Sequence, residues 1–188
     1  MFVWSGQRAK RLFYNGKEVL LAYTRDGMIH SAGKLGSFTV AGTPETVSCG
    51  IGCSDTVYVF SPDGDRTDIS ATPNEGGMGL YAIHPSYDFG RRFSFTGRDS
   101  LLRLSVPESA CDLNIAGFSA LKGVTINNSL IPSEKISRIL IDLVANGVQD
   151  GHFCRTSSNS PITGDGLTAK QTLKARGWTF FLDNVAET

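Results

Sequence analysis

Long hydrophobic runs are missing from this sequence of 188 residues: no stretch approaches the ~20 apolar residues that a membrane-spanning helix needs. The first residues also lack the basic and then apolar pattern of a secretory signal peptide. We therefore expect a chain that is made in a cytoplasm, with reduced thiols and no membrane insertion. Hydrophobic residues make up 40% of the sequence, which is enough for a folded core.

Metal-binding patterns are also scarce. The four cysteines are Cys49, Cys53, Cys111 and Cys154. Three residues separate Cys49 from Cys53 and no second pair matches them, so the spacing does not indicate zinc and free thiols are expected. Asp63, Asp65 and Asp68 depart from the calcium-loop pattern, and we interpret them as solvated carboxylates of a turn. We expect no metal and no cofactor.

Catalytic motifs are missing as well. His30, His84 and His152 are widely separated, and the sequence has neither a Gly-x-Ser-x-Gly elbow nor a His-Glu-x-x-His motif. His84 is interpreted as a residue that holds a turn within a β-sandwich. A glycan hydrolase, which needs two carboxylates at a cleft, is disfavoured only by this lack of motifs. We expect no catalytic residues and predict that the protein is not an enzyme.

Charge is balanced over the whole chain, with 18 basic and 18 acidic residues, but it is uneven along it. Residues 1–34 carry six Lys or Arg against two acidic residues, a net charge of +4, and the remainder carries −4. The basic segment could contact an acidic face in an assembly, or it could be an ordinary solvated surface. No basic stripe is interleaved with aromatics, so we expect no nucleic-acid partner.

The first 34 residues predict a β-ribbon. Residues 3–9 and 13–19 each have the pattern strand, Gly-containing turn, strand, and a third turn follows at Asp26-Gly27. A ribbon this thin is only marginally stable alone, so its aromatic side chains must be covered by the next domain or by a partner. The residues that we expect at a contact with a partner protein are Trp4, Phe13, Tyr14 and Tyr23.

From residue 35 to residue 99 the pattern changes to short apolar strands, of which the clearest are 37–40, 57–60, 80–83 and 92–95. Clusters of Pro, Gly, Asp and Asn separate them. Short strands with this punctuation predict a β-sandwich.

Residues 100–188 predict a small α+β region. Apolar pairs recur every eleven residues, at Leu102 and Leu104, Leu113 and Ile115, and Val124 and Ile126. They indicate either stacked repeat units, with Asn127 in a ladder, or three ordinary strands joined by tight loops. A helix is predicted over 133–146, with Ser133 as its N-cap and Gly147 as its stop, and a second over about 167–176. Strands are predicted near 151–155 and over 178–182, with Trp178 buried in the core.

Three parts of the chain resemble known families. Residues 57–98 resemble a PKD-like sandwich, through the Asp63-Gly64 turn and through His84, Tyr87 and Gly90. Residues 100–182 resemble a leucine-rich tail of phage and bacterial surface proteins. The motifs that carry this likeness are the helix end Ile139–Gly147, Pro161-Ile-Thr-Gly-Asp-Gly166 and Leu173-Lys-Ala-Arg-Gly-Trp178. The N-terminal repeats resemble the β-ribbons that begin many phage tail and head appendage proteins.

The expected fold is therefore mostly β, a β-sandwich with a small α+β leucine-rich-like C-terminal region. Its expected segments are a docking ribbon at 1–34, a PKD-like sandwich at 35–99 and the leucine-rich-like region at 100–188. The resemblances imply a structural protein of a phage virion, in the tail, fibre or host-attachment apparatus. A head decoration protein and a carbohydrate- or receptor-binding module are the alternatives. The implied partners are other virion proteins, further copies of the chain and a host receptor or glycan.

Overall fold

The computed structural model describes residues 35–60, 69–74, 77–84, 91–156 and 160–182 with their side chains. It also describes the backbone of five short strands, four before residue 35 and one at the C-terminal end. The described chain is mostly β, with two larger sheets and two helices, α1 (Ser133–Asn146) and α2 (Asp165–Ala175). The prediction of a β-rich fold is confirmed.

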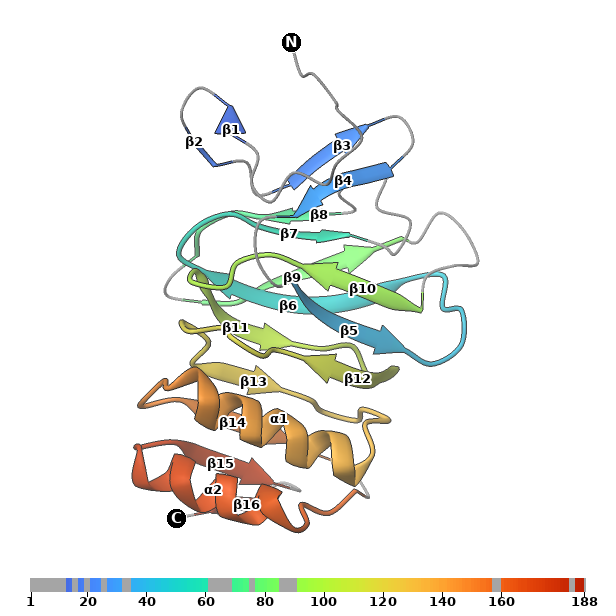
Figure 1. Ribbon diagram of the computed structural model, residues 1–188. Coiled ribbons are helices and arrows are strands. Elements are labelled where there is room, and N and C mark those ends of the chain that lie inside the picture. Colours follow the sequence, from blue (N-terminus) through green and yellow to red (C-terminus); the bar gives the residue numbers. More distant parts are fainter. Residues whose placement is uncertain are drawn as a thin grey trace.

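The two larger sheets have five and seven strands (Figure 1). The five-stranded sheet has the order β12 (Ala110–Asn114), β5 (Gly36–Val40), β10 (Arg92–Phe95), β7 (Val57–Phe60) and β8 (Ile69–Ala71). The seven-stranded sheet has the order β16 (Val185–Glu187), β15 (Thr179–Leu182), β14 (His152–Arg155), β13 (Gly123–Thr125), β11 (Leu101–Ser105), β6 (Val47–Cys53) and β9 (Gly79–Ile83).

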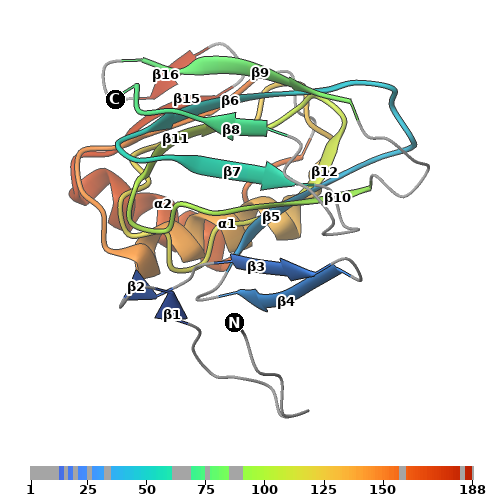
Figure 2. The same ribbon diagram turned by 90° about the horizontal axis from the view of Figure 1, so that it is seen from above.

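The two sheets are built differently. All pairings in the five-stranded sheet are antiparallel. In the seven-stranded sheet, β11, β13, β14 and β15 run parallel, and β12, α1 and α2 connect them in turn. Each connection returns along the same side of the seven-stranded sheet, so the helices continue the layer of the five-stranded sheet (Figures 1 and 2). Parallel pairing requires such crossovers, which explains why helices appear only in this half.

The core lies between these two layers. The row Ile51, Leu104, Val124, Phe153 and Phe180 crosses the seven-stranded sheet at one register level, and each of these side chains is at most 2% exposed. In the opposite layer, the rings of Phe38, Phe93, Phe95 and Phe118 pack against one another, and the centroids of the contacting rings lie 5.1 to 6.3 Å apart. All of these residues belong to one hydrophobic cluster.

Helix α1 follows its predicted range of 133–146, because its apolar residues recur every three or four positions and form one face. Ile136, Ile139, Leu140 and Leu143 are buried on that face. Gly147 ends the helix with φ 79°, the left-handed conformation that glycine adopts without strain. The prediction of Ser133 as the N-cap is wrong: Pro132 holds the N-cap position and Ser133 is the first helical residue. The fixed φ of proline suits this helix start.

Helix α2 packs closely on α1. A β-carbon built on Gly166 would lie 2.6 Å from Ser137 Cβ and 2.8 Å from Ser137 Cα, so only glycine allows this approach. Trp178 follows α2 and is 3% exposed. Its Nε1–H donates to the carbonyl of Val148 at 2.9 Å. The predicted burial of Trp178 is confirmed, and the predicted second helix begins two residues earlier than expected.

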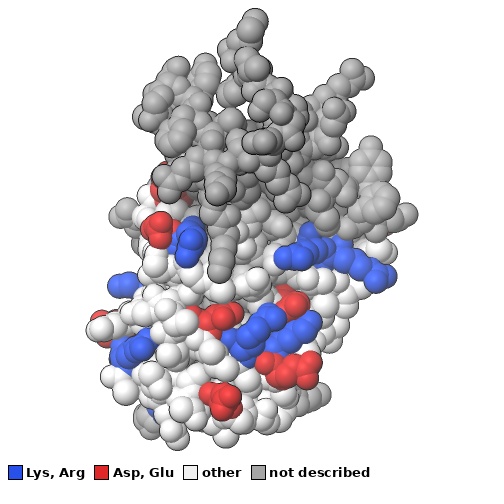
Figure 3. All heavy atoms as spheres, in the orientation of Figure 1, with Lys and Arg blue, Asp and Glu red and all other residues white. Residues whose placement is uncertain are grey.

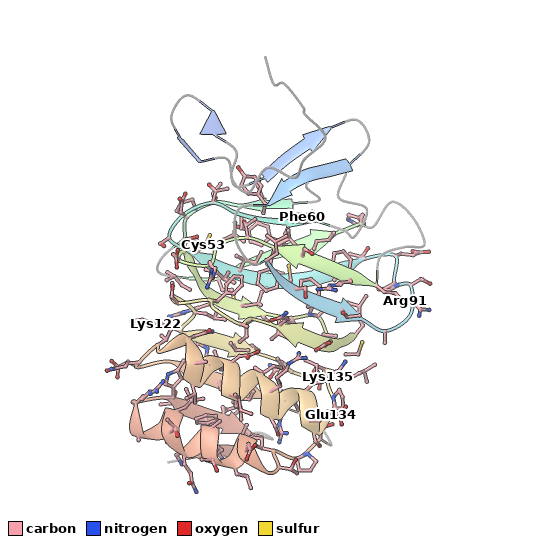
Figure 4. The ribbon with its side chains drawn as sticks, in the orientation of Figure 1. Cys53, Phe60, Arg91, Lys122, Glu134 and Lys135 are labelled. Atoms are coloured by element: carbon pink, nitrogen blue, oxygen red, sulfur yellow. The ribbon has the colours of Figure 1, made fainter. Side chains whose placement is uncertain are left out.

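The join between strands and helices lies where α1 follows β12. Arg138 donates to the carbonyl of Leu113, Lys135 to that of Cys111, and the side chain of Asn146 bonds both Ile115 and Gly117. Asp112 accepts hydrogen bonds and ion pairs from both basic residues, at 2.7 and 3.1 Å. Figure 4 shows Lys135 on the first turn of α1. Side chains of α1 thus satisfy the strand edge that a further strand would otherwise cover.

The sequence predicted four of the described strands well. The runs at 37–40, 57–60, 80–83 and 92–95 correspond to β5, β7, β9 and β10 within one residue. It missed β6, the longest strand, because two glycines and two cysteines hide its alternation. The eleven-residue spacing reflects strands that alternate between layers: β11 and β13 are parallel neighbours, whereas β12 between them pairs with β5.

Both sheets continue across the predicted segment boundary after residue 99. β6 pairs with β11, β5 pairs with β12, and one core cluster includes residues from both sides of that boundary. Before residue 35, β1 (Phe13–Tyr14) pairs with β2 (Lys17–Glu18), and β3 (Leu21–Thr24) pairs with β4 (Gly27–Ser31), both antiparallel. The first hairpin agrees with the predicted Asn15-Gly16 turn. The predicted Asp26-Gly27 turn is displaced, because Gly27 lies in β4 opposite Thr24.

Candidate functional site on the outer face of the seven-stranded sheet

The predicted docking residues fall largely outside the described part of the chain. Trp4 is not described. Phe13, Tyr14 and Tyr23 lie in β1 and β3, where the backbone pairs Phe13 with Glu18, Tyr14 with Lys17 and Tyr23 with Met28, and their side chains are not described. The hypothesis that these four residues contact a partner stays a prediction.

The clearest described surface is the outer face of the seven-stranded sheet. Side chains alternate between the two faces of a strand, so the neighbours of the buried row point away from the core. The residues of this outer face on the four parallel strands are Arg103, Ser105, Gly123, Thr125, His152, Cys154, Thr179 and Phe181. Arg103, Thr179 and Phe181 are exposed, whereas Ser105, Thr125, His152 and Cys154 are half-buried.

The continuation of this outer face on β6 is covered by a loop. A β-carbon on Gly50 would lie 3.0 Å from Met78 Sδ, and one on Gly52 would lie 2.6 Å from the carbonyl oxygen of Gly77. Asn74 secures the loop, since its side chain donates to Ile51 O at 2.8 Å and accepts from Cys53 N at 2.7 Å. The glycines of β6 therefore make room for the loop. The outer face that the described residues leave uncovered consists of β11, β13, β14 and β15.

Within this uncovered face, the side chains of Arg103 and His152 both lie against Gly123. They lie on β11 and β14 and flank Gly123 of the strand between them, in one row across the sheet. A β-carbon on Gly123 would lie 2.6 Å from His152 Cε1 and 3.0 Å from Arg103 Cγ. The missing side chain of Gly123 lets the imidazole and the alkyl stem of the arginine share this space.

The electrostatics of this pair favour a neutral histidine. Burial lowers the pKa of His152 below its ordinary value of 6.5, and the positive charge of Arg103 lowers it further. On the same strand, burial raises the pKa of Cys154, whose Sγ donates to Asn127 Oδ1 at 3.5 Å. The site therefore combines a permanent cation, a titratable imidazole and the hydroxyls of Ser105, Thr125 and Thr179.

The opposite surface, formed by the five-stranded sheet and the helices, has another character. Basic and acidic side chains lie next to one another on it (Figure 3). Lys135 and Arg138 share the carboxylate of Asp112, as described above. Burial raises the pKa of Asp112, but hydrogen bonds and the charges of these two residues outweigh it, so the net shift is downward. This cluster joins α1 to β12 within one layer and is explained by structure alone.

The other predicted polar residues have separate places. His84 is exposed, and its Nδ1 lies 3.1 Å from Thr46 Oγ1. Asp63, Asp65 and Asp68 lie outside the described residues. All four cysteines are free, and the part of the chain that the structure describes contains no group of three metal-binding side chains. No described helix is long and apolar enough to cross a membrane.

Comparison with known proteins identifies no relative: no family model, no curated protein and no solved structure matches the chain. The outer face itself is therefore the basis for inferring a function. Sequence reasoning missed this site because Arg103 and His152 lie far apart in the chain and become neighbours only through the parallel pairing of β11, β13 and β14. Gly123 is the first residue of β13, and Gly151 directly precedes β14. Neither glycine indicates this pairing in the sequence.

Proposed function

We propose that this chain is a non-enzymatic structural component of a phage virion, in the tail, fibre or host-attachment apparatus. In this proposal, residues 1–34 dock on the particle through Trp4, Phe13, Tyr14 and Tyr23. The rest of the chain is a rigid scaffold that presents the outer face of the seven-stranded sheet. Other virion proteins and further copies of the chain are the docking partners.

One observation carries the proposal: the described chain combines a fully packed two-layer scaffold with one uncovered sheet face of regularly spaced side chains. Phe181 is 39% exposed on that face, and Arg103 and Thr179 are exposed beside it. The core residues beneath are at most 2% exposed, so a packed core supports the strands that carry these side chains. A rigid face of this kind suits recognition of a partner better than chemistry in a cleft.

The finer fold interpretation belongs to the same proposal. The buried row recurs at Leu104, Val124, Phe153 and Phe180, after 20, 29 and 27 residues. Leucine-rich repeats usually span about 20–29 residues and stack parallel strands in this way. This agreement supports a leucine-rich-like C-terminal region, and the antiparallel strands before it support a PKD-like sandwich.

Two alternatives share the same architecture. A head decoration protein also needs a small oligomer-forming β-protein, and a carbohydrate- or receptor-binding module would use the outer face without any particle. The exposed outer face favours the second of these over the first, because decoration requires only the docking segment.

Mass photometry of the purified full chain separates these functions. A stable trimer, hexamer or ring supports a virion component, because particle symmetry requires such assemblies. A monomer that binds members of a glycan array supports the carbohydrate-binding module. A monomer that binds no glycan contradicts both, and turnover of a glycan substrate would overturn the non-enzymatic assignment.

A further inference from the structure

Among the described residues, no acidic side chain pairs with the two basic side chains over Gly123. Neither the guanidinium of Arg103 nor the imidazole of His152 forms a hydrogen bond or ion pair with another described residue. Two basic groups held together repel each other when both are charged, and Arg103 accordingly helps to lower the pKa of His152. An anion between them would favour the charged form of both. On α1, by contrast, the basic residues Lys135 and Arg138 share the carboxylate of Asp112.

Few of the described residues face His152. Across the neighbouring strands it meets Gly123 and Thr179, and Thr125 lies on the same face one step further along β13. Cys154 follows on its own strand. The charged residues near the strand starts are Lys122 before β13 and Asp150 before β14, and the carboxylate of Asp150 lies over Gly177, where a β-carbon would be 2.3 Å from its Oδ1.

We propose that Arg103 and His152 bind an oxyanion, a carboxylate or phosphate group, carried by an acidic saccharide of a host surface. The guanidinium offers parallel N–H donors to two oxygens, and the imidazolium donates one more N–H. Ser105, Thr125 and Thr179 supply hydroxyls at strand spacing for the hydroxyls of the sugar. The exposed ring of Phe181 offers a flat apolar surface to the C–H face of a sugar ring.

This inference rests on the proposed function, because it assigns a ligand to the face that the scaffold presents. It also predicts a pH dependence. The free protein holds His152 uncharged at neutral pH, and a bound oxyanion favours the charged imidazolium. Binding therefore takes up a proton, and affinity should increase as the pH falls from about 8 to about 6.

The test is an NMR titration of the full chain with four probes: inorganic phosphate, an oligogalacturonate, a neutral malto-oligosaccharide of equal length and a thymidine oligonucleotide. Saturable shifts at His152 are expected with the first two and not with the third. The oligogalacturonate, whose carboxylates stay charged over this range, should bind more tightly at about pH 6 than at about pH 8. R103Q and H152Q should each weaken binding at least about fivefold. The matched controls R91Q and H84Q, which alter exposed residues elsewhere, should bind like the unchanged chain.

Equal binding by all four variants would overturn the site, as would no saturable binding of either anion. Binding of phosphate without the oligogalacturonate would overturn the saccharide assignment, and so would tighter binding of a thymidine oligonucleotide than of the oligogalacturonate. Mass photometry of R103Q keeps the two proposals distinguishable. An oligomer that persists while binding is lost supports this site, and a chain that never assembles contradicts the virion role without affecting the binding result.

Discussion

The strand half and the helix half of the layer opposite the seven-stranded sheet cover the same core by different means. In the strand half, β5, β10 and β7 satisfy one another through backbone hydrogen bonds, and four phenylalanine rings fill the interior. In the helix half, the backbone hydrogen bonds of α1 and α2 lie within each helix. Side chains of α1 bond the backbone carbonyls at the edge of β12. A helix can therefore follow a strand in one layer if polar side chains of the helix bond the unpaired backbone carbonyls of that strand.

The largest expected effect concerns whether the two halves unfold together. Trp178→Ala removes a buried ring from the helix half and should lower the free energy of unfolding by about 3–5 kcal/mol. Trp178→Phe, which mainly loses the hydrogen bond to Val148, should cost about 1–2 kcal/mol. Because one core cluster spans both halves, urea unfolding followed by circular dichroism should remain a single transition. A second, earlier transition confined to the helix half would show that the halves are separate units.

A smaller effect is expected at the contact between the two helices. Gly166→Ala places a methyl group against the backbone of Ser137, so α2 must shift away from α1. We expect a loss of about 1–3 kcal/mol in thermal or urea unfolding. Thr168→Ala, at an exposed position of the same helix, is the matched control and should change stability by less than about 0.5 kcal/mol. Equal stability of both variants would mean that the helices do not pack this closely.

The ion pairs that join the halves should contribute less, because all three side chains are partly exposed. Asp112→Asn should lower stability at neutral pH by about 1 kcal/mol. The pKa of Asp112 is lowered in the folded protein, so its contribution is present above the unfolded pKa of about 3.9 and is lost as the pH falls through the folded value. The difference between Asp112→Asn and the unchanged chain should therefore shrink in urea unfolding at low pH.

Asp142 on α1 is a control, because its pKa is shifted in the opposite direction to that of Asp112. Burial raises its pKa, with Arg138 acting in the opposite direction, so its charged form costs stability as the pH rises. Asp142→Asn should be neutral or slightly stabilising at neutral pH. If both substitutions destabilised the chain equally, the join would depend on general surface charge and not on the match between α1 and β12.

The smallest effect compares the two faces of the seven-stranded sheet without altering stability. Burial raises the pKa of Cys49, which points into the core, to about 12, whereas Cys154 is half-buried on the outer face. Iodoacetamide should label Cys49 at least about tenfold more slowly than Cys154 in the folded chain, and at equal rates in urea. Mass spectrometry of the labelled peptides measures both rates. Similar rates in the folded chain would contradict the assignment of inner and outer faces.

Local patterns predicted the elements better than their arrangement. The spacing of Ile136, Ile139, Leu140 and Leu143 predicts α1 because helix periodicity depends only on neighbours along the chain. β6 escaped prediction because Gly50 and Gly52 stand where a loop covers the strand, a contact that the sequence does not reveal. The parallel order of the strands depends on crossovers between layers, which no local pattern specifies.

The candidate site depends on that arrangement more than any single element does. Arg103 and His152 look like unrelated surface residues until β13 places Gly123 between them. The aromatic residues before residue 35, which local composition does point to, remain a prediction because their side chains are not described.

In the proposed function, residues 1–34 dock on the particle, and a different part of the chain presents the outer face of the seven-stranded sheet. Mass photometry of three proteins tests it: the full chain, the chain without residues 1–34, and the full chain with Thr125→Lys on the outer face. Lysine can extend into solvent from this half-buried position, so folding should persist, which the melting temperature checks. We expect an oligomer for the full chain and for Thr125→Lys, and a folded monomer for the truncated chain. An oligomer that survives the truncation but is broken by Thr125→Lys would contradict it.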